Sequence, residues 1–190
     1  MADIHIDNSL SVYGLVKRSG THRSLLRDRY TMLTISREIE NTVIFGQIRA
    51  RIFSGFQRMS AFLPQMPRYR RLANYAESVY VFGYPDVTIP PIMNVHYIPL
   101  SQDAQLKKEW FLIADAPDYF SALSTEEVED QHGFEGVWSF DEEMVTILQE
   151  WLSSMVDARS LGDLSARRNY RKQVALMGET LVRMTAHLAP

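Results

Sequence analysis

The sequence predicts an α/β fold, with one domain built on a central sheet of about five strands and flanked by helices, followed by a C-terminal helix with a heptad-like seam. Short apolar runs typical of interior strands alternate with longer segments of helical periodicity, which is the pattern of a sheet covered by helices. The chain has 190 residues and is 46% hydrophobic, which is enough for one sizeable core.

The amino-terminal part is expected to comprise a lead-in over residues 1–20 and then a helix. The lead-in holds a short apolar cluster around Val12 and Tyr13, and its structure is left open. Thr21 is a suitable N-cap for the helix, and Gly46 a suitable end. The apolar face recurs at helical spacing and comprises Leu25, Met32, Ile35, Ile39 and Val43. The polar side is expected to face solvent and includes Arg29, Arg37, Glu38 and Glu40.

Five apolar runs are expected to form the strands of the sheet. They are Arg51–Phe56, Val79–Gly83, Val95–Pro99, Trp110–Ala114 and Gly136–Phe140. Pro64 and Pro67 frame the start of a helix between the first two strands, because proline is tolerated in a first helical turn. Another helix is expected from about Asp118 to Glu129, and the order of the strands is left open.

The last strand is followed by a helix that Ser139 and Glu142 are expected to open as a capping box. Its buried face is expected to comprise Met144, Ile147, Leu148, Trp151 and Met155. The core domain is therefore assigned to residues 21–159, and residues 160–190 are assigned to a separate C-terminal helix.

This C-terminal helix carries apolar residues at alternating spacings of four and three, which form a heptad seam. The seam comprises Tyr170, Val174, Met177, Leu181, Met184 and Leu188. Two interpretations stay open. The seam can form a homodimer interface or output element, or it can pack the helix on its own domain.

Composition excludes several classes of protein. The net charge of −3 and the pI near 6.0 give no attraction to nucleic acid, so direct nucleic-acid binding is not expected. No apolar run approaches the roughly 18 residues that span a bilayer, and the chain opens with the polar MADIHIDN, so a cytoplasmic protein without membrane association is expected. Because cysteine is absent, disulfides and cysteine-linked chromophores are excluded.

The sequence contains none of the catalytic or phosphate-binding motifs sought. The glycine-rich dinucleotide and P-loop patterns are absent, as is the G-x-S-x-G elbow. No metal site is expected, because the histidines lack ligand spacing; they are His5, His22, His96, His132 and His187. An enzyme is therefore not expected, and the identity of any cofactor stays unknown.

Arginines and aromatic residues gather around the first predicted strand and the helix after it. Such a set suits a small anionic or planar ligand through bidentate and stacking contacts. The candidate ligand-binding residues are Gln57, Arg58, Phe62, Tyr69, Arg70, Arg71 and Trp110. The alternative is that the arginines pair with surface acids while the aromatic residues, including Phe56, fill the core.

Four segments of the chain together resemble the DICT domain family of sensory modules. They are TMLTISREIENTVI, SGFQRMSAFLPQMPRYRRLANYAESVYVFG, EWFLIADAPDYFSAL and FEGVWSFDEEMV, and they lie between Thr31 and Met155. The resemblance implies an α/β sensor of bacterial signal transduction that acts alone or joined to output domains, in light responses with bilin-containing partners. It implies no catalytic residues.

The leading hypothesis is a stand-alone sensory module that binds a small ligand or a signalling partner protein and responds through its last helix. If it acts in a light response, the chromophore is held non-covalently or by a partner, since cysteine is absent. The second hypothesis is an interaction or scaffold protein that dimerises through the C-terminal helix.

Overall fold

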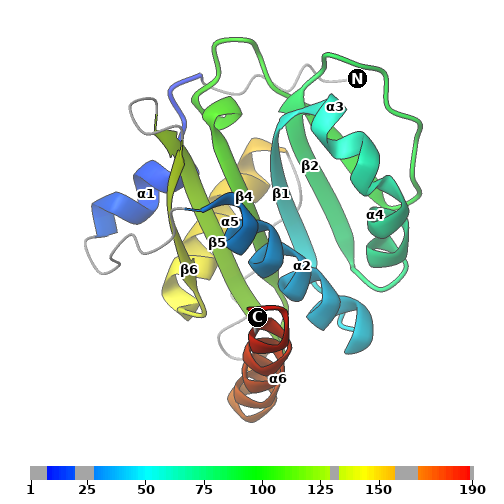
Figure 1. Cartoon of the computed structure of the whole chain (residues 1–190), viewed down its shortest axis with the longest axis vertical. Helices are drawn as coiled ribbons and strands as arrows, with labels where there is room; N and C mark the ends of the chain where they lie inside the picture. The colour runs from blue at the N-terminus through cyan, green and yellow to red at the C-terminus, as the bar shows by residue number, and fades with distance from the viewer. Residues whose placement is uncertain (1–7, 20–27, 129–132, 157–166, 189–190) are drawn as a thin grey trace.

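Figure 1 shows a computed structural model that describes residues 8–19, 28–128, 133–156 and 167–188. Its centre is a six-stranded sheet with the order β3-β2-β1-β4-β5-β6. The strands are β1 (Arg51–Arg58), β2 (Ser78–Tyr84), β3 (Val95–Pro99), β4 (Glu109–Asp115), β5 (Phe120–Val128) and β6 (Gly133–Ser139). The strands β1 to β3 pair in parallel, whereas β4 is antiparallel to β1 and the β4–β5 and β5–β6 pairs are also antiparallel. The predicted α/β fold is confirmed, with six strands instead of five.

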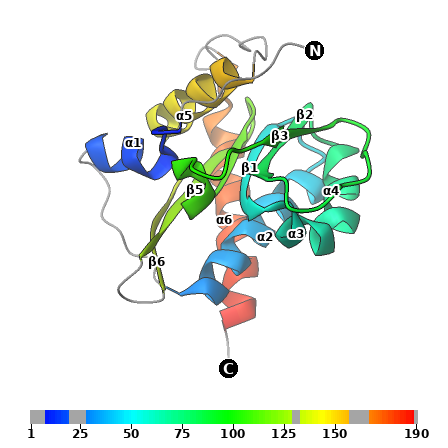
Figure 2. The same ribbon diagram turned by 90° about the horizontal axis from the view of Figure 1, so that it is seen from above.

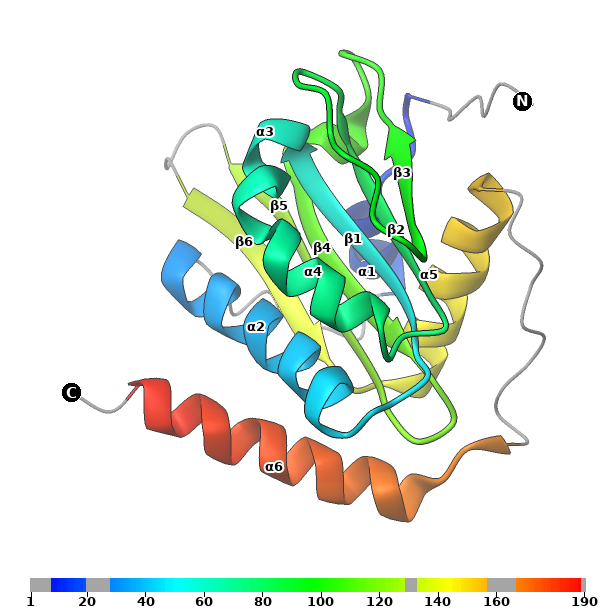
Figure 3. The same cartoon turned by 90° about the vertical axis from the view of Figure 1, so that its right-hand side faces the viewer.

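Helices cover both faces of this sheet. They are α1 (Val12–Ser19), α2 (Arg29–Phe45), α3 (Met59–Phe62), α4 (Met66–Ala73), α5 (Glu142–Met155) and α6 (Tyr170–Leu188), with short 3-10 turns at Leu63–Gln65 and Gln105–Lys108. Figures 2 and 3 show α1 and α5 on one face and α2, α3, α4 and α6 on the other. The result is a three-layer arrangement, in which each layer of helices has its own apolar cluster against the sheet.

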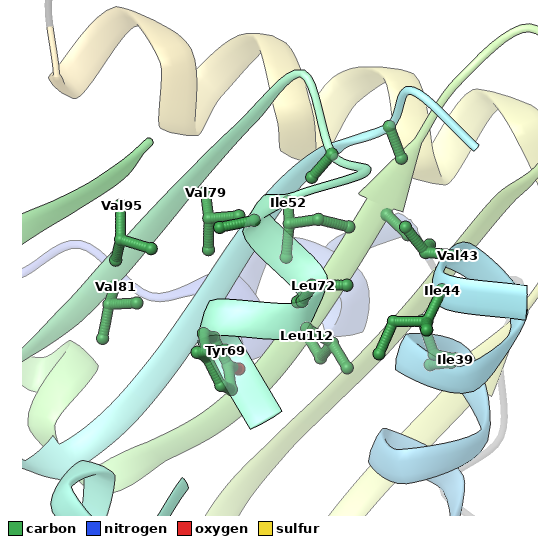
Figure 4. Packing of buried hydrophobic residues seen from close by; sticks show 14 of the residues in the cluster. Ile39, Val43, Ile44, Ile52, Tyr69, Leu72, Val79, Val81, Val95 and Leu112 are labelled. Carbon is green, nitrogen blue, oxygen red and sulfur yellow. The ribbon is translucent and has the colours of Figure 1, made fainter. Parts of the chain in front are cut away.

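Alternation along the strands sends successive side chains to opposite layers. Ile52 joins the cluster under α2 and α4, whereas its neighbour Phe53 joins the cluster under α1 and α5. In the same way, Leu112 and Ile113 of β4 point to opposite layers. Figure 4 shows Ile52, Leu112 and their neighbours packed between the sheet and the helices α2 and α4.

The helix expected between about Asp118 and Glu129 is wrong, because Phe120–Val128 forms strand β5. Alanine, leucine and glutamate in this segment favour a helix by intrinsic propensity. The segment nevertheless pairs along its length with β4 on one side and with β6 on the other. Tertiary pairing therefore overrides local propensity, and the residues before the strand form the turn of a hairpin.

The helix starts also differ from the sequence predictions. Helix α2 begins after Asp28, whose carboxylate accepts a hydrogen bond of 3.0 Å from the backbone N–H of Thr31. Thr21, the expected cap, lies outside the described residues. Helix α5 is capped by Asp141, which accepts from the Met144 N–H at 2.8 Å, so the capping box predicted for Ser139 and Glu142 is wrong.

The buried face of α5 is rotated slightly from the predicted one. Met144 and Leu148 are buried as expected, but Ile147 is 48% exposed. Val145 and Leu152 take its place in the core, beside α1 and the sheet.

Helix α6 is attached to the domain mainly by polar groups. The side-chain amide of Gln173 both donates to the carbonyl of Phe120 and accepts from its N–H, each at 2.9 Å. Arg168, just before the helix, donates to Asp115 at 2.6 Å and to the Ala116 carbonyl at 2.8 Å. These contacts fix the start of α6 to the hairpin that joins β4 and β5.

Replacing Gln173 by alanine should lower the free energy of unfolding by about 1–3 kcal/mol, because the buried backbone groups of Phe120 lose their partners. Denaturant unfolding measures this change, and amide hydrogen exchange in α6 should become faster. The exposed neighbour Arg171 provides the control, since Arg171→Ala should change neither quantity. Equal stabilities for the two variants would show that Gln173 does not anchor the helix.

Helix α1 is held at its first turn by Glu109 of β4. The carboxylate Oε2 accepts hydrogen bonds from the N–H groups of Val12 at 2.9 Å and of Tyr13 at 3.2 Å. Glu109 is fully buried, and this burial raises its pKa from 4.5 to about 7. The positive end of the helix dipole and the two N–H donors explain why a carboxylate is accepted there.

The raised pKa of Glu109 predicts a specific pH dependence of stability. Between pH 4.5 and 7 the folded protein holds a proton that the unfolded chain releases, so the free energy of unfolding falls as pH rises through this window. The shift corresponds to about 3 kcal/mol. Urea unfolding from pH 4.5 to 8 should show a shallower decline for Glu109→Gln than for the wild type. Exposed Glu150→Gln is the control, and a decline unchanged by Glu109→Gln would contradict the assignment.

Candidate ligand site

A cavity of about 190 Å³ lies between the sheet and the amino-terminal part of α2, on the face of the sheet that α3 and α4 also cover. Strands β1, β4 and β6 form its base, near the carboxyl end of β1. Helix α2 contributes residues at spacings of four, three, one and three, which place them on one face of the helix. They are Arg29, Leu33, Ser36, Arg37 and Glu40.

The lining of the cavity changes with depth. Its floor contains the buried hydroxyls of Ser36 and Ser54, and its walls are half-buried or buried apolar side chains. The wall residues are Leu33, Phe56, Trp110, Leu112 and Phe134, whereas the side chain of Phe111 belongs to the cluster on the opposite face of the sheet. The rim is polar or exposed and comprises Arg29, Arg37, Gln57, Ala61 and Gln65. An apolar cavity with a few polar groups is typical of small-molecule sites.

The hydroxyl of Ser36 has no hydrogen-bond partner, although the residue is only 5% exposed. Other hydroxyls in the same helix behave differently. Thr34 donates to the carbonyl of Tyr30 at 2.9 Å, and Thr42 donates to the carbonyl of Glu38 at 2.8 Å. A buried hydroxyl without a partner is costly, so Ser36 marks a place where a bound molecule can supply the missing hydrogen bond.

Beside Ser36 the cavity is bordered by a group of coupled polar side chains. Tyr69 donates from its hydroxyl to Ser54 at 2.8 Å. Glu40 forms an ion pair with the Nε of Arg68 of α4. Burial raises the pKa of Glu40, although the guanidinium of Arg68 opposes this shift. Burial, together with the nearby Glu40 carboxylate, raises the pKa of Tyr69 well above its ordinary value, so the phenol stays protonated.

Glycine is required at position 55 of β1, where a side chain would point to the layer of α1 and α5, away from the cavity. A Cβ at this position would lie 2.3 Å from Cε1 of Phe111 on the neighbouring strand β4. The ring of Phe111 therefore lies directly against the backbone of β1, and a side chain at position 55 would displace it.

The structure places three of the predicted ligand-binding residues around this cavity: Gln57, Tyr69 and Trp110. Phe62 lies in the core, fully buried, with its ring 5.0 Å from that of Tyr69. Arg70 and Arg71 are exposed on α4 and do not line the cavity.

Arg58 lies away from the cavity. It borders a second, more polar depression near the 3-10 turn at Gln105–Lys108, which also includes Lys107, Lys108 and Glu127. The basic residues at the candidate site thus come from α2 and not from the arginine-rich helix α4.

The sequence analysis did not predict that these α2 residues line a site, because it assigned the polar side of the helix to solvent. Arg29 and Arg37 are indeed exposed, but they stand at the rim of the cavity. Glu38 and Glu40 are 1% and 5% exposed, so their expected exposure is wrong. The sequence does contain an indication that Ser36 is buried. It lies between the apolar positions Ile35 and Ile39 and is too near the apolar face of the helix to face water.

Helix α2 also contacts α6, on a face adjacent to the cavity. The hydroxyls of Thr42 and Thr180 are 2.7 Å apart, and Thr180 is fully buried. Arg183 of α6 donates to the Glu38 carboxylate at 2.7 Å and to the Thr42 hydroxyl at 2.6 Å. One rigid helix therefore lines the cavity and carries the attachment of α6.

The predicted seam of α6 is only partly covered. Tyr170, Val174 and Leu181 are 54%, 61% and 42% exposed. Met177 and Met184 are half-buried, and Met184 packs against the core. The side chain of Leu188 lies outside the described residues. The helix thus binds its own domain through Gln173, Leu176, Thr180 and Arg183, one position away from the seam.

Two classes of feature are absent from the described parts of the chain. No helix among these residues is long and apolar enough to cross a membrane. No group of three or more histidine and acidic side chains there could hold a metal ion.

Comparison with known proteins identifies one family. The model of the DICT family, described as a sensory domain in diguanylate cyclases and two-component systems, matches residues 9–128. Comparison with curated protein sequences gave no significant match, and neither did comparison with solved structures. The match runs from α1 to β5 and includes every cavity-lining residue except Phe134. The chain therefore belongs to the DICT family of sensory domains.

Proposed function

We propose that the protein senses a small ligand, which binds in the cavity beneath α2, and that the response passes through α6. The observation that carries this proposal is the buried hydroxyl of Ser36, which lines an apolar cavity without a partner. Buried polar groups usually have a partner, and among the described side chains with a partnerless buried polar atom, which include Ser124, Ser36 alone lines this cavity. The sensory character of the family supports the same conclusion.

The contacts of α2 supply a route for the response. A ligand at Ser36 and Arg37 contacts the same helical segment whose Glu38 and Thr42 hold α6. A movement of α2 that improves ligand contacts changes the geometry of these buried hydrogen bonds. Because a ligand shifts an equilibrium only by its different affinity for two states, the proposal requires that α6 be bound differently in those states.

A role in light responses would involve a partner protein in this proposal. Without cysteine, the chain cannot attach a bilin through a thioether. The cavity of about 190 Å³ is also too small to enclose a linear tetrapyrrole. The chromophore would therefore be carried by a signalling partner, and the DICT domain would respond to that partner or to a second, smaller ligand.

Filling the cavity should prevent ligand binding. Leu33→Trp adds bulk at the cavity wall, so a small molecule that co-purifies from the native host with the wild-type protein should be lost from this variant. Mass spectrometry of denatured protein detects it. Leu15→Trp on α1, also half-buried but on the opposite face of the sheet, is the matched control and should retain the ligand. The same small molecules in all three proteins would contradict the proposal, as would the absence of any co-purified molecule together with no binding of added small ligands.

A second candidate function is that of an interaction protein that dimerises through α6. The observation that favours it is the exposure of Tyr170, Val174 and Leu181 at heptad spacing. A second copy is the natural occupant, because a seam of this spacing packs against an identical seam about a two-fold axis. The homodimer is thus a proposal about the same helix that we regard as the output element.

Charges in the seam should abolish such a dimer. Light scattering should give a dimer mass for the full chain and a monomer mass for the Val174→Glu, Leu181→Glu double variant, since buried unpaired carboxylates oppose association. Thr185→Glu, exposed on the same helix, is the control. These substitutions are preferable to removal of α6, which would also expose the polar groups that Gln173 satisfies. A monomeric wild-type protein would exclude the dimer.

A further inference from the structure

The size of the cavity limits what it can enclose. A cavity of about 150 Å³ lined by apolar side chains is sufficient for benzene. The cavity beneath α2, with about 190 Å³, can therefore enclose a single ring with a small substituent. Ligands with two purine bases exceed this volume.

The walls select for a flat ring. Phe56 and Trp110 lie at the cavity with half-buried rings, and Phe134 packs its ring edge-on to Trp110 at a centroid distance of 6.3 Å. Aromatic side chains favour stacked or edge-to-face contacts with another aromatic ring. Leu33 of α2 completes the apolar wall from the helical side.

The rim supplies positive charge. Arg29 and Arg37 lie eight residues apart on the cavity-facing side of α2. Neither guanidinium makes a hydrogen bond or an ion pair with another described side chain, whereas Arg68 is engaged with Glu40. A guanidinium pairs most favourably with a carboxylate, which can accept two parallel hydrogen bonds. The rim thus suits an anionic group at the outer end of the ligand.

The floor supplies hydrogen bonds at the inner end. The Ser36 hydroxyl has no partner, and the Ser54 hydroxyl nearby is hydrogen-bonded to the Tyr69 hydroxyl at 2.8 Å. A hydroxyl or carbonyl on the ring could form a hydrogen bond with Ser36. A ring without a polar substituent would leave Ser36 unsatisfied.

We propose that the cavity binds a small aromatic carboxylate that carries a polar substituent on the ring. The ring lies among Phe56, Trp110 and Phe134, the carboxylate faces Arg29 and Arg37, and the substituent meets Ser36. This inference rests on the proposed sensory function, since it names the class of ligand for the same cavity.

Four probes and the full chain test this assignment by titration calorimetry. They are 4-hydroxybenzoate, benzoate, 4-hydroxybenzamide and trans-4-hydroxycyclohexanecarboxylate. We expect 4-hydroxybenzoate to bind at least tenfold more tightly than each of the others, because each lacks one of the three features: the hydroxyl, the charge or the flat ring. Equal affinity for the acid and the amide, or binding of none of the four, would overturn the proposal.

Two variants, with a third as control, test which residues contact the substituent and the carboxylate of the ligand. Ser36→Ala should weaken 4-hydroxybenzoate about tenfold and leave benzoate unchanged, with a melting temperature of the free protein that is unchanged or higher. Arg37→Gln should weaken the acid but not the amide, and Arg71→Gln, on exposed α4, should weaken neither. A Ser36→Ala protein that unfolds more easily and weakens all probes equally would show a structural role instead, and would contradict the assignment.

The outcomes separate this inference from the proposed function. If a co-purified molecule is lost from Leu33→Trp but is not displaced by the aromatic acids, the sensory cavity stands and the ligand class is wrong. If no molecule co-purifies and no probe binds, both proposals fail.

Discussion

Two carboxylates buried on α2 determine how the helical layer on one face of the sheet is assembled. Glu38 and Glu40 are almost inaccessible to water, and an uncompensated charge there would be strongly destabilising. Glu38 is paired with Arg183 of α6, and Glu40 with Arg68 of α4. Helix α2 is thus the shared partner of the two helices beside it, and each partner is specified by a charge and not only by shape.

The fold was largely predictable because most of its strands are apolar runs between clear turns. The runs at β1, β2 and β4 are buried on both sides, and such strands are recognisable without knowledge of their neighbours. Strand β5 was not predictable in this way. Its serine, threonine and glutamate residues are compatible with a helix, and only the pairing with β4 and β6 decides their conformation. Local patterns cannot supply that information.

The candidate site was predictable only in part, for a related reason. Tyr69 could be proposed because it lies among arginines in the helix after the first strand, and Trp110 because an aromatic residue on a strand can form the wall of a pocket. The rim residues Arg29 and Arg37 could not, since a helix with charges on one side normally turns that side to water. Their role depends on the position of α2 over the carboxyl end of β1, which is a tertiary property. The arginines of α4 were predicted to bind the ligand because several of them occur together in the sequence. Their number, however, does not determine whether their side chains lie at the cavity.

The polar attachment of α6 has a thermodynamic consequence. Its contacts with the domain are dominated by Gln173, Thr180 and Arg183, with Leu176 as the main buried apolar side chain. Exposure of apolar surface raises the heat capacity, whereas exposure of polar surface lowers it. Detachment of α6 exposes both kinds of surface, so the two contributions to its heat-capacity change oppose each other. The free energy of detachment is then close to a linear function of temperature, and its slope is set by the entropy of detachment.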